Sequence, residues 1–244
     1  MKLSNNVILI TGGGSGIGLA FTEKFLELGN DVLICGRDQQ KLDAAQAKYP
    51  GLKTFRCDLT RPGDTAAMVG KIKSDFPGLN MLINNAGIQH NYRFDDGEDH
   101  IAEIDHEINA NFSSHLRLTD SLLPLLMAKK EAAVVNISSA LSIVPKESAP
   151  VYCATKAGMH IFSRALRYQL EHSPVKVFEV VPALVDTAMT KGRGQGKISP
   201  EALVAEAVKG IEHDKFYIRI GKTKALFVIH RLFPFLADKI IRKG

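Results

Sequence analysis

The sequence is poor in cysteine, and the cysteines it has follow no pairing pattern. Cys35, Cys57 and Cys153 are odd in number and lack the paired spacing of a zinc site. We therefore expect three reduced thiols rather than a disulfide framework. Reduced thiols favour the cytoplasm as the location of the chain.

Long hydrophobic runs and a strong excess of one charge are also absent. No stretch reaches the roughly 20 apolar residues of a membrane-spanning helix. The apolar run at residues 7–10 leads directly into glycines, which is unlike a secretory signal peptide. Thirty-one Lys and Arg against 26 Asp and Glu give a formal charge of +5. This mild excess suits small anionic ligands such as nucleotide phosphates, and the scattered basic residues argue against nucleic acid as a partner.

What the chain does contain is an alternation of short β-branched runs with longer amphipathic segments. With 45% apolar residues in 244, it can form a single domain over residues 1–244. A helix ending before Gly29, and another starting at Ser199 and Pro200, are typical of such a pattern. We expect an α/β fold: a doubly wound, mostly parallel seven-stranded sheet with helices on both faces and ligands at the carboxyl ends of the strands. The predicted strands are residues 7–10, 32–35, 54–57, 81–83, 133–137, 175–181 and 216–220.

A glycine-rich loop follows the first predicted strand. It reads Thr11-Gly12-Gly13-Gly14-Ser15-Gly16-Ile17-Gly18 and does not contain the common dinucleotide spacing G-x-G-x-x-G. Its glycines still allow a sharp turn and let the backbone approach a pyrophosphate at the start of the next helix. The sequence therefore predicts nucleotide contacts from this loop, made by Thr11, Gly12, Gly14, Ser15, Gly16, Ile17 and Gly18.

Tyr152 and Lys156 form the second candidate site. They are four residues apart, so on a helix they share a face, and an ammonium beside a phenol favours the phenolate. Such a tyrosine can give or take a proton, while Ser139, after the fifth predicted strand, can hydrogen-bond the same substrate oxygen. We assign no metal, and interpret the histidines as exposed helical residues: His90, His100, His106, His115, His160 and His172.

The order of these motifs resembles that of the classical short-chain dehydrogenase/reductase family. The loop matches T-G-x-x-x-G-x-G, Asn84-Asn85-Ala86-Gly87 follows the fourth predicted strand, and Tyr152 with Lys156 forms Y-x-x-x-K, so the resemblance spans roughly residues 5–190. It implies a Rossmann-like fold, a nicotinamide cofactor and a catalytic tetrad of Asn111, Ser139, Tyr152 and Lys156. It also implies that Tyr152, Lys156 and a further set of residues contact the cofactor: Asp58, Leu59, Asn85, Ala86, Gly87, Pro182, Val185 and Thr187.

Two members of the tetrad have close competitors. Ser139 is preferred to Ser138 because it stands thirteen residues before Tyr152, the interval usual in the family. Asn111 is preferred to Asn109 because it opens an N-[LF]-x-[SG] pattern. The resemblance implies that Lys156 holds the ribose and that Asn111 fixes a water in a proton relay. One departure is visible, since the usual Pro-Gly after the sixth strand is Pro182-Ala183 here.

The second predicted strand runs into Gly36 and Arg37 rather than into an acid. Arg37 offers a cation for a 2′-phosphate, so we expect NADP rather than NAD, although Asp38 could turn inward and repel the phosphate. The substrate is expected to be a small, lipophilic carbonyl or alcohol. Its apolar pocket would be formed by Ile88, Leu141, Ile143, Val144 and Met189.

The sequence also predicts a substrate loop, a C-terminal tail with a separate role and an oligomer. Residues 188–198, rich in glycine, are predicted to be a mobile substrate loop. The tail, residues 222–244, contains basic residues and apolar residues at helical spacing, so it is predicted to be helical with a break at Pro234. It is expected either to contact an anionic membrane or to pack on the substrate pocket or on a partner subunit. A homodimer or homotetramer is expected through the helices at residues 105–127 and 152–170, whose apolar residues include Phe112, Leu116, Leu118, Ile161, Phe162 and Leu166.

Two alternatives to an active hydride-transferring enzyme remain open. The first is a catalytically silent protein that senses or binds the cofactor on the same fold, which the intact tetrad argues against. The second is a dehydratase or epimerase, but the chain lacks the long C-terminal substrate domain of those relatives.

Overall fold

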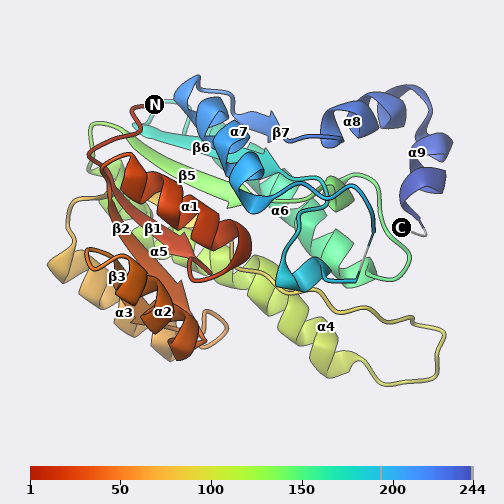
Figure 1. Ribbon diagram of the computed structural model, residues 1–244, viewed down its shortest axis with the longest axis horizontal. Helices are drawn as coiled ribbons and strands as arrows, with labels where there is room; N and C mark the ends of the chain where they lie inside the picture. Colours follow the sequence, from red (N-terminus) through yellow and green to blue (C-terminus); the bar gives the residue numbers. More distant parts are fainter. Residues whose placement is uncertain (193, 243–244) are drawn as a thin grey trace.

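Seven parallel strands form one sheet in the computed structural model, which describes residues 1–192 and 194–242. The strand order is β3-β2-β1-β4-β5-β6-β7, and all neighbouring strands pair in parallel (Figure 1). The order reverses between β1 and β4, and parallel sheets bind ligands at such a switch point. All seven predicted strands are confirmed: β1 (Val7–Thr11), β2 (Asp31–Gly36), β3 (Lys53–Arg56), β4 (Leu79–Asn84), β5 (Ala132–Ile137), β6 (Val175–Val181) and β7 (Tyr217–Arg219).

Helices cover both faces of the sheet, as predicted, so the fold is Rossmann-like and built as a single domain. Buried residues of α1, α2 and α7 pack on one face, and those of α3, α5 and α6 pack on the other. Gly29 ends α1 with a φ of 75°, and the Ser199 hydroxyl caps α7 by accepting from Ala202 N. The helices are α1 (Gly16–Glu27), α2 (Gln39–Lys48), α3 (Pro62–Asp75), α4 (Ile101–Ile108), the π-helix η1 (Asn109–Ser113), α5 (Ser114–Met127), the 3₁₀ turn η2 (Ala140–Ser142), α6 (Pro150–Gln169), the 3₁₀ turn η3 (Ala188–Thr190), α7 (Pro200–Glu212), α8 (Thr223–Leu232) and α9 (Pro234–Ile241).

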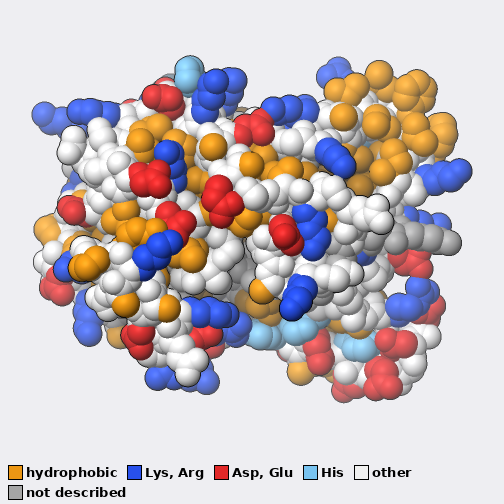
Figure 2. Space-filling view, viewed as in Figure 1, with side chains coloured by type: hydrophobic (Ala, Val, Ile, Leu, Met, Phe, Trp, Pro, Cys, Tyr) orange, Lys and Arg blue, Asp and Glu red, His pale blue; other side chains and the backbone are white. Residues whose placement is uncertain are grey.

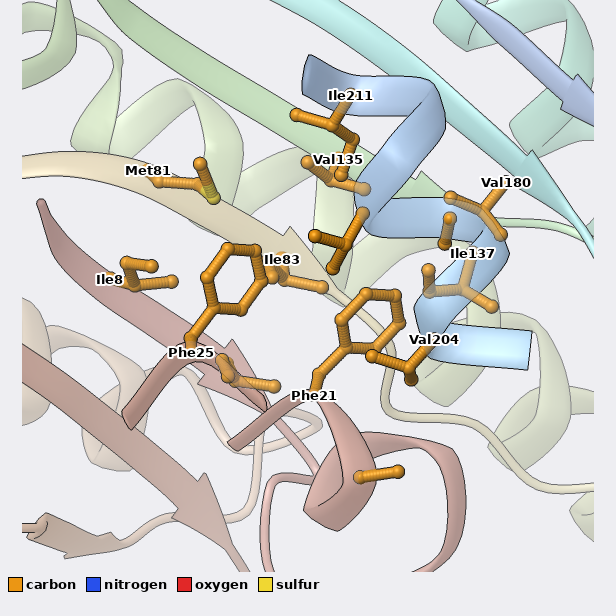
Figure 3. Packing of buried hydrophobic residues seen from close by; sticks show 14 of the residues in the cluster. Ile8, Phe21, Phe25, Met81, Ile83, Val135, Ile137, Val180, Val204 and Ile211 are labelled. Carbon is orange, nitrogen blue, oxygen red and sulfur yellow. The ribbon is translucent and has the colours of Figure 1, made fainter. Parts of the chain in front are cut away.

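Two phenylalanines of α1 anchor the core next to the glycine loop (Figure 3). Phe21 and Phe25 are fully buried and stack with ring centroids 6.1 Å apart. They lie between the sheet and α7, where Val204 and Ile211 face them. Full burial of side chains this large stabilises the fold by about 2 kcal/mol or more each, so α1 is held firmly against the sheet.

The three cysteines are free thiols inside the protein. Cys35 lies in β2 opposite Thr11 of β1, Cys57 follows β3, and Cys153 lies on α6. All three are buried. Burial raises the pKa of each thiol, that of Cys57 to about 11. Buried thiols of raised pKa carry little thiolate at neutral pH and are therefore poor nucleophiles.

The tail forms two helices separated at Pro234, so the predicted break is confirmed. Among the residues the structure describes, no helix is long and apolar enough to cross a membrane. Lys243 and Gly244 of the predicted tail, and Arg193 of the predicted loop at 188–198, lie outside the described residues. Ile198, the last residue of that loop, forms a bridge with Val185, which lies three residues before the loop, and the mobility of the loop stays a prediction.

Candidate functional site

The glycine loop turns tightly between β1 and α1. Gly12 and Gly16 adopt φ values of 66° and 52°, which residues with a side chain rarely adopt. A Cβ at Gly18 would lie 2.1 Å from the carbonyl oxygen of Gly12, too close for any side chain. The backbone at the start of α1 therefore lies at the surface of the loop, where its N–H groups can bind an anion.

Thr11 fastens the loop to the end of β4. Its buried hydroxyl donates to Ile83 O at 3.2 Å and accepts from the backbone N–H groups of Asn85 and Ala86 at 2.8 and 2.9 Å. The Asn85 side chain in turn donates to Thr11 O at 2.9 Å. These bonds hold the ends of β1 and β4 together at the switch point.

A cleft of about 400 Å³ runs along this switch point, and most of the predicted cofactor residues line it. Thr11, Gly18 and Val185 do not line it, because they lie behind the loop or in the core, where they position the residues that do. Lining residues that the sequence did not suggest include Lys41, Thr60 and Ala110. The predicted residues in the cleft are Gly12, Gly14, Ser15, Gly16, Ile17, Arg37, Asp58, Leu59, Asn85, Ala86, Gly87, Tyr152, Lys156, Pro182 and Thr187.

Tyr152 and Lys156 enter the cleft from α6. The ammonium of Lys156 lies 5.6 Å from the centroid of the Tyr152 ring and donates to Ile137 O at 2.9 Å. Lys156 is almost fully buried, and burial lowers the pKa of its amine to about 8. The amine is thus mostly charged at neutral pH, within reach of both the phenol ring and the end of β5.

Asn111 lies in the π-helix η1, an irregularity often found at functional sites. Its amide donates to Ile88 O and its oxygen accepts from Ile88 N, both at 2.8 Å. A Cβ at Gly87 would lie 3.2 Å from Asn111 Oδ1 and 3.8 Å from Lys156 Nζ, so both side chains converge on this glycine. Asn109 points elsewhere and donates to Thr60 O, which favours Asn111 over Asn109.

Ser138 and Ser139 differ in their hydrogen bonds. Ser138 is 2% exposed and donates to the Glu179 carboxylate at 2.6 Å, so its hydroxyl is already engaged. Ser139 is half-buried and caps η2 by accepting from Leu141 N at 3.1 Å, which leaves its hydroxyl hydrogen for another acceptor. The geometry favours Ser139, although Ser138 rather than Ser139 is among the residues lining the cleft.

The prediction that the six histidines are exposed helical residues is wrong for all of them. Only His172 of the six is exposed, and it lies in a turn; His106, His115 and His160 lie on helices but are not exposed, and His90 and His100 are half-buried outside the helices. His115 is 1% exposed, and its Nε2 lies 2.7 Å from Ala86 O. Burial first, and the nearby charge of Lys156, lower its pKa to about 4, so the ring is neutral and its N–H supports the Ala86 carbonyl. His160 lies 2.9 Å from the buried carboxylate of Glu179. The one sequence signal for His115 is its place one helical turn after Asn111.

Arg37 lines the cleft at the end of β2, where its guanidinium lies 3.2 Å from His106 Nε2. Asp38 caps α2 by accepting from Lys41 N at 3.2 Å, and it pairs with the Lys41 ammonium at 3.3 Å. Asp58 has a lowered pKa: partial burial acts to raise it, but hydrogen bonds from Thr60 and the charge of Arg37 outweigh that effect.

The predicted apolar pocket forms only in part. Ile88 and Met189 line the cleft, but Leu141, Ile143 and Val144 do not. Val144 is fully buried and packs with Leu226 of α8 and Ala237 of α9. The segment after Ser139 therefore supports the C-terminal helices, and the prediction was wrong for Val144.

Comparison with known proteins agrees with this geometry. The family model described as "short chain dehydrogenase" matches residues 6–197. The chain is 38% identical over 232 residues to the uncharacterized oxidoreductase DltE of Bacillus subtilis, covering 93% of this chain and 92% of the relative.

Solved structures show the same fold. A short-chain dehydrogenase from Sphingobium yanoikuyae in complex with NADPH is 27% identical, with a TM-score of 0.82 and 96% of each chain covered. One from Burkholderia phymatum in complex with NAD is 19% identical, with a TM-score of 0.85, and covers 100% of this chain and 97% of its own. The family match, the fold and the order of the motifs along the cleft agree: the chain belongs to the short-chain dehydrogenase family of oxidoreductases.

Proposed function

We propose that this oxidoreductase transfers a hydride between NADP(H) and a small lipophilic carbonyl or alcohol, with Tyr152 as the acid and base. The observation that carries the proposal is that Tyr152 and Lys156 share one cleft with the glycine loop. A hydride donor bound on the loop and a proton donor on α6 would then meet across a single substrate carbon and oxygen.

The cleft fits a dinucleotide in shape and in charge. Gly12, Gly14 and Gly16 present bare backbone beside the start of α1, where a pyrophosphate is stabilised by N–H groups and the helix dipole. Gly87 and Lys156 would hold the sugar and nicotinamide end, Ser15 would contact the pyrophosphate with the glycines beside it, and Asp58 with Leu59 would hold the adenine end. When bound, the nicotinamide supplies the hydride chemistry.

The protein's own part is to hold and move one proton. In reduction Tyr152 donates its phenolic proton to the substrate oxygen, and in oxidation it accepts the proton of the alcohol. The Lys156 charge, 5.6 Å from the ring centroid, favours the phenolate that donation leaves behind. Ser139 hydrogen-bonds the substrate oxygen, and Asn111, which converges with Lys156 on Gly87, positions a water that returns the proton.

The residues at the end of β2 support NADP over NAD. Arg37 and Lys41 both line the cleft there, and two cations suit a 2′-phosphate. Asp38 lines the cleft as well, but its carboxylate caps α2 and pairs with the Lys41 ammonium, so its negative charge is compensated there. Short-chain dehydrogenase structures hold either nucleotide, so the preference rests on these side chains.

The substrate end and the assembly follow from exposed apolar residues. Met189, 37% exposed in the segment 188–198, and Ile88 favour a lipophilic substrate covered by that segment as a moving loop.

Ile161 and Tyr168 on the outer face of α6 are well exposed, which supports a homodimer or homotetramer built through α5 and α6. The three free, buried thiols of the protein favour the cytoplasm as its location.

Tyr152→Phe tests the assignment. Nicotinamide absorbance is followed with NADPH or NADH and a panel of carbonyls, and the variant is expected to lose about a hundredfold or more in kcat. Nucleotide binding should stay close to that of the wild type, because only the hydroxyl is deleted. Tyr49→Phe, at the end of α2 and not among the residues lining the cleft, is the control and should retain activity.

Two outcomes would reject the proposal. A Tyr152→Phe protein as active as the control would remove Tyr152 from the chemistry. A wild-type protein that binds NADP tightly but turns over no carbonyl or alcohol would instead support a silent cofactor-binding protein.

A further inference from the structure

The outer sides of α8 and α9 carry a concentration of exposed apolar residues, which we call the C-terminal face. Figure 2 shows hydrophobic side chains gathered over these two helices at one end of the molecule. Large apolar residues are normally exposed singly on a soluble protein, and a contiguous patch marks an interaction surface. Its members are Val228, Leu232, Phe233, Phe235, Leu236 and Ile240, all 41–74% exposed.

The fold itself does not need these side chains. Leu226 and Ala237 already fix the two helices by packing against Val144, with Ile229 and Ile241 beside them. A surface helix usually turns polar residues outward once its inner side is buried. Here the outer side is apolar as well, so the C-terminal face is suited to a contact outside the chain.

The net charge of the protein is concentrated in the same segment. Residues 222–244 contain six of the 31 Lys and Arg but only one of the 26 Asp and Glu. The preceding 221 residues therefore hold 25 of each and are formally neutral. The excess of +5 thus belongs to the segment that carries the C-terminal face.

Several of these cations are available to an outside partner. Lys224 pairs with Glu206, and Arg242 pairs with Glu147 at 2.9 Å. Lys222, Arg231 and Lys239 are exposed and form no ion pair within residues 1–192 and 194–242. Basic side chains border the apolar area in Figure 2.

We propose that the C-terminal face binds an anionic lipid bilayer, with α8 and α9 lying in the plane of the surface. Helices with Phe and Leu on one side and Lys and Arg at the margins bind such interfaces through apolar burial and attraction to anionic headgroups. A second copy of this chain fits less well, because pairing the two faces would bring like charges together. The inference stands apart from the proposed catalysis.

Vesicle flotation tests the proposal with the full-length protein. Vesicles of phosphatidylcholine alone are compared with vesicles of equal parts phosphatidylglycerol and phosphatidylcholine. The wild type is expected to float with the anionic vesicles only, and less at high salt because salt screens the attraction. Arg231→Gln with Lys239→Gln should weaken partitioning about thirtyfold, and Leu232→Ser with Phe235→Ser about tenfold or more.

Matched controls separate the surface from general effects. Met127→Ser removes an apolar side chain as exposed as Leu236 from the end of α5, and Lys71→Gln with Lys73→Gln removes two exposed cations from α3. Both should float like the wild type, and thermal unfolding should show every variant folded.

Three results would overturn the inference. One is a wild type that stays unbound with anionic vesicles at low salt. Another is equal flotation with both lipids that the loss of Arg231 and Lys239 does not alter. The third is sedimentation in which Leu232→Ser with Phe235→Ser converts a dimer to a monomer, which would make the C-terminal face a subunit interface.

Discussion

The buried charge of Lys156 should lower the stability of the protein while serving its chemistry. The side chain is 4% exposed, and burial lowers the amine pKa from its ordinary value of 10.5 to about 8. Keeping it protonated at pH 7 therefore costs about 3 kcal/mol of folding free energy, at 1.36 kcal/mol for each pKa unit. Lys156→Met removes this cost and loses the hydrogen bond to Ile137 O, which contributes about 1 kcal/mol. We expect the variant to be more stable than the wild type by about 2 kcal/mol.

The gain should depend on pH with a defined sign. Below pH 8 the amine is charged in both the folded and the unfolded chain, so the full cost is present. Between pH 8 and 10.5 the unfolded chain binds more protons, and the wild type gains stability until the cost is gone. The advantage of Lys156→Met should therefore shrink through this window.

Urea unfolding without cofactor at several pH values measures the difference. Lys53→Met, which removes an exposed lysine from β3, is the control and should show no such pH dependence. The reasoning fails if Lys156→Met is less stable than the wild type at pH 7, or if the difference between them stays constant up to pH 10.5.

Three further predictions concern nucleotide preference, the loop and assembly. Arg37→Ala should weaken NADP binding about tenfold to a hundredfold and leave NAD binding nearly unchanged, since a charge-assisted hydrogen bond is lost; equal weakening of both in titrations would contradict the NADP assignment. Gly18→Ala should destabilise the protein by about 2 kcal/mol or more and impair nucleotide binding, because the new Cβ would lie 2.1 Å from Gly12 O. Gly63→Ala is the control: the space around its Cβ is open, so it should change neither stability nor nucleotide binding. Sedimentation velocity at micromolar concentration should show a dimer that Ile161→Asp disrupts, and a monomeric wild type would refute an interface on α6.

The fold was largely predictable because parallel strands that are buried on both sides of the sheet consist mainly of consecutive apolar residues. Residues 32–35, Val-Leu-Ile-Cys, form such a run within β2. Residues 175–181 became β6 without any change of bounds, although Lys176 and Glu179 interrupt their apolar residues. The end of α1 at Gly29 and the start of α7 at Ser199 were also predictable from the sequence. Both depend on a local property, the positive φ that glycine allows and the serine hydroxyl that caps a helix. The ends of the other strands shifted by one or two residues, because pairing with a neighbouring strand decides where a strand ends more than its own sequence does.

Long-range contacts were what the sequence could not supply. Val144 looked like a pocket residue next to Ser139, but its burial depends on α8 and α9, about 80 or more residues later. His115 looked like any helical histidine because nothing local shows that its ring faces Ala86 O. The partnership of Ser138 with Glu179 crosses from β5 to β6 and was equally hidden.

The buried thiols give the protein three internal reporters of its own motion. Cys35 lies beside the glycine loop, Cys57 at the end of β3, and Cys153 on the helix that carries Tyr152. A maleimide can reach each sulfur only when the surrounding structure opens, so the rate of alkylation measures that opening site by site. Mass spectrometry of the three labelled peptides would then read the breathing of the nucleotide end and the catalytic helix separately, in a chain with no engineered probe.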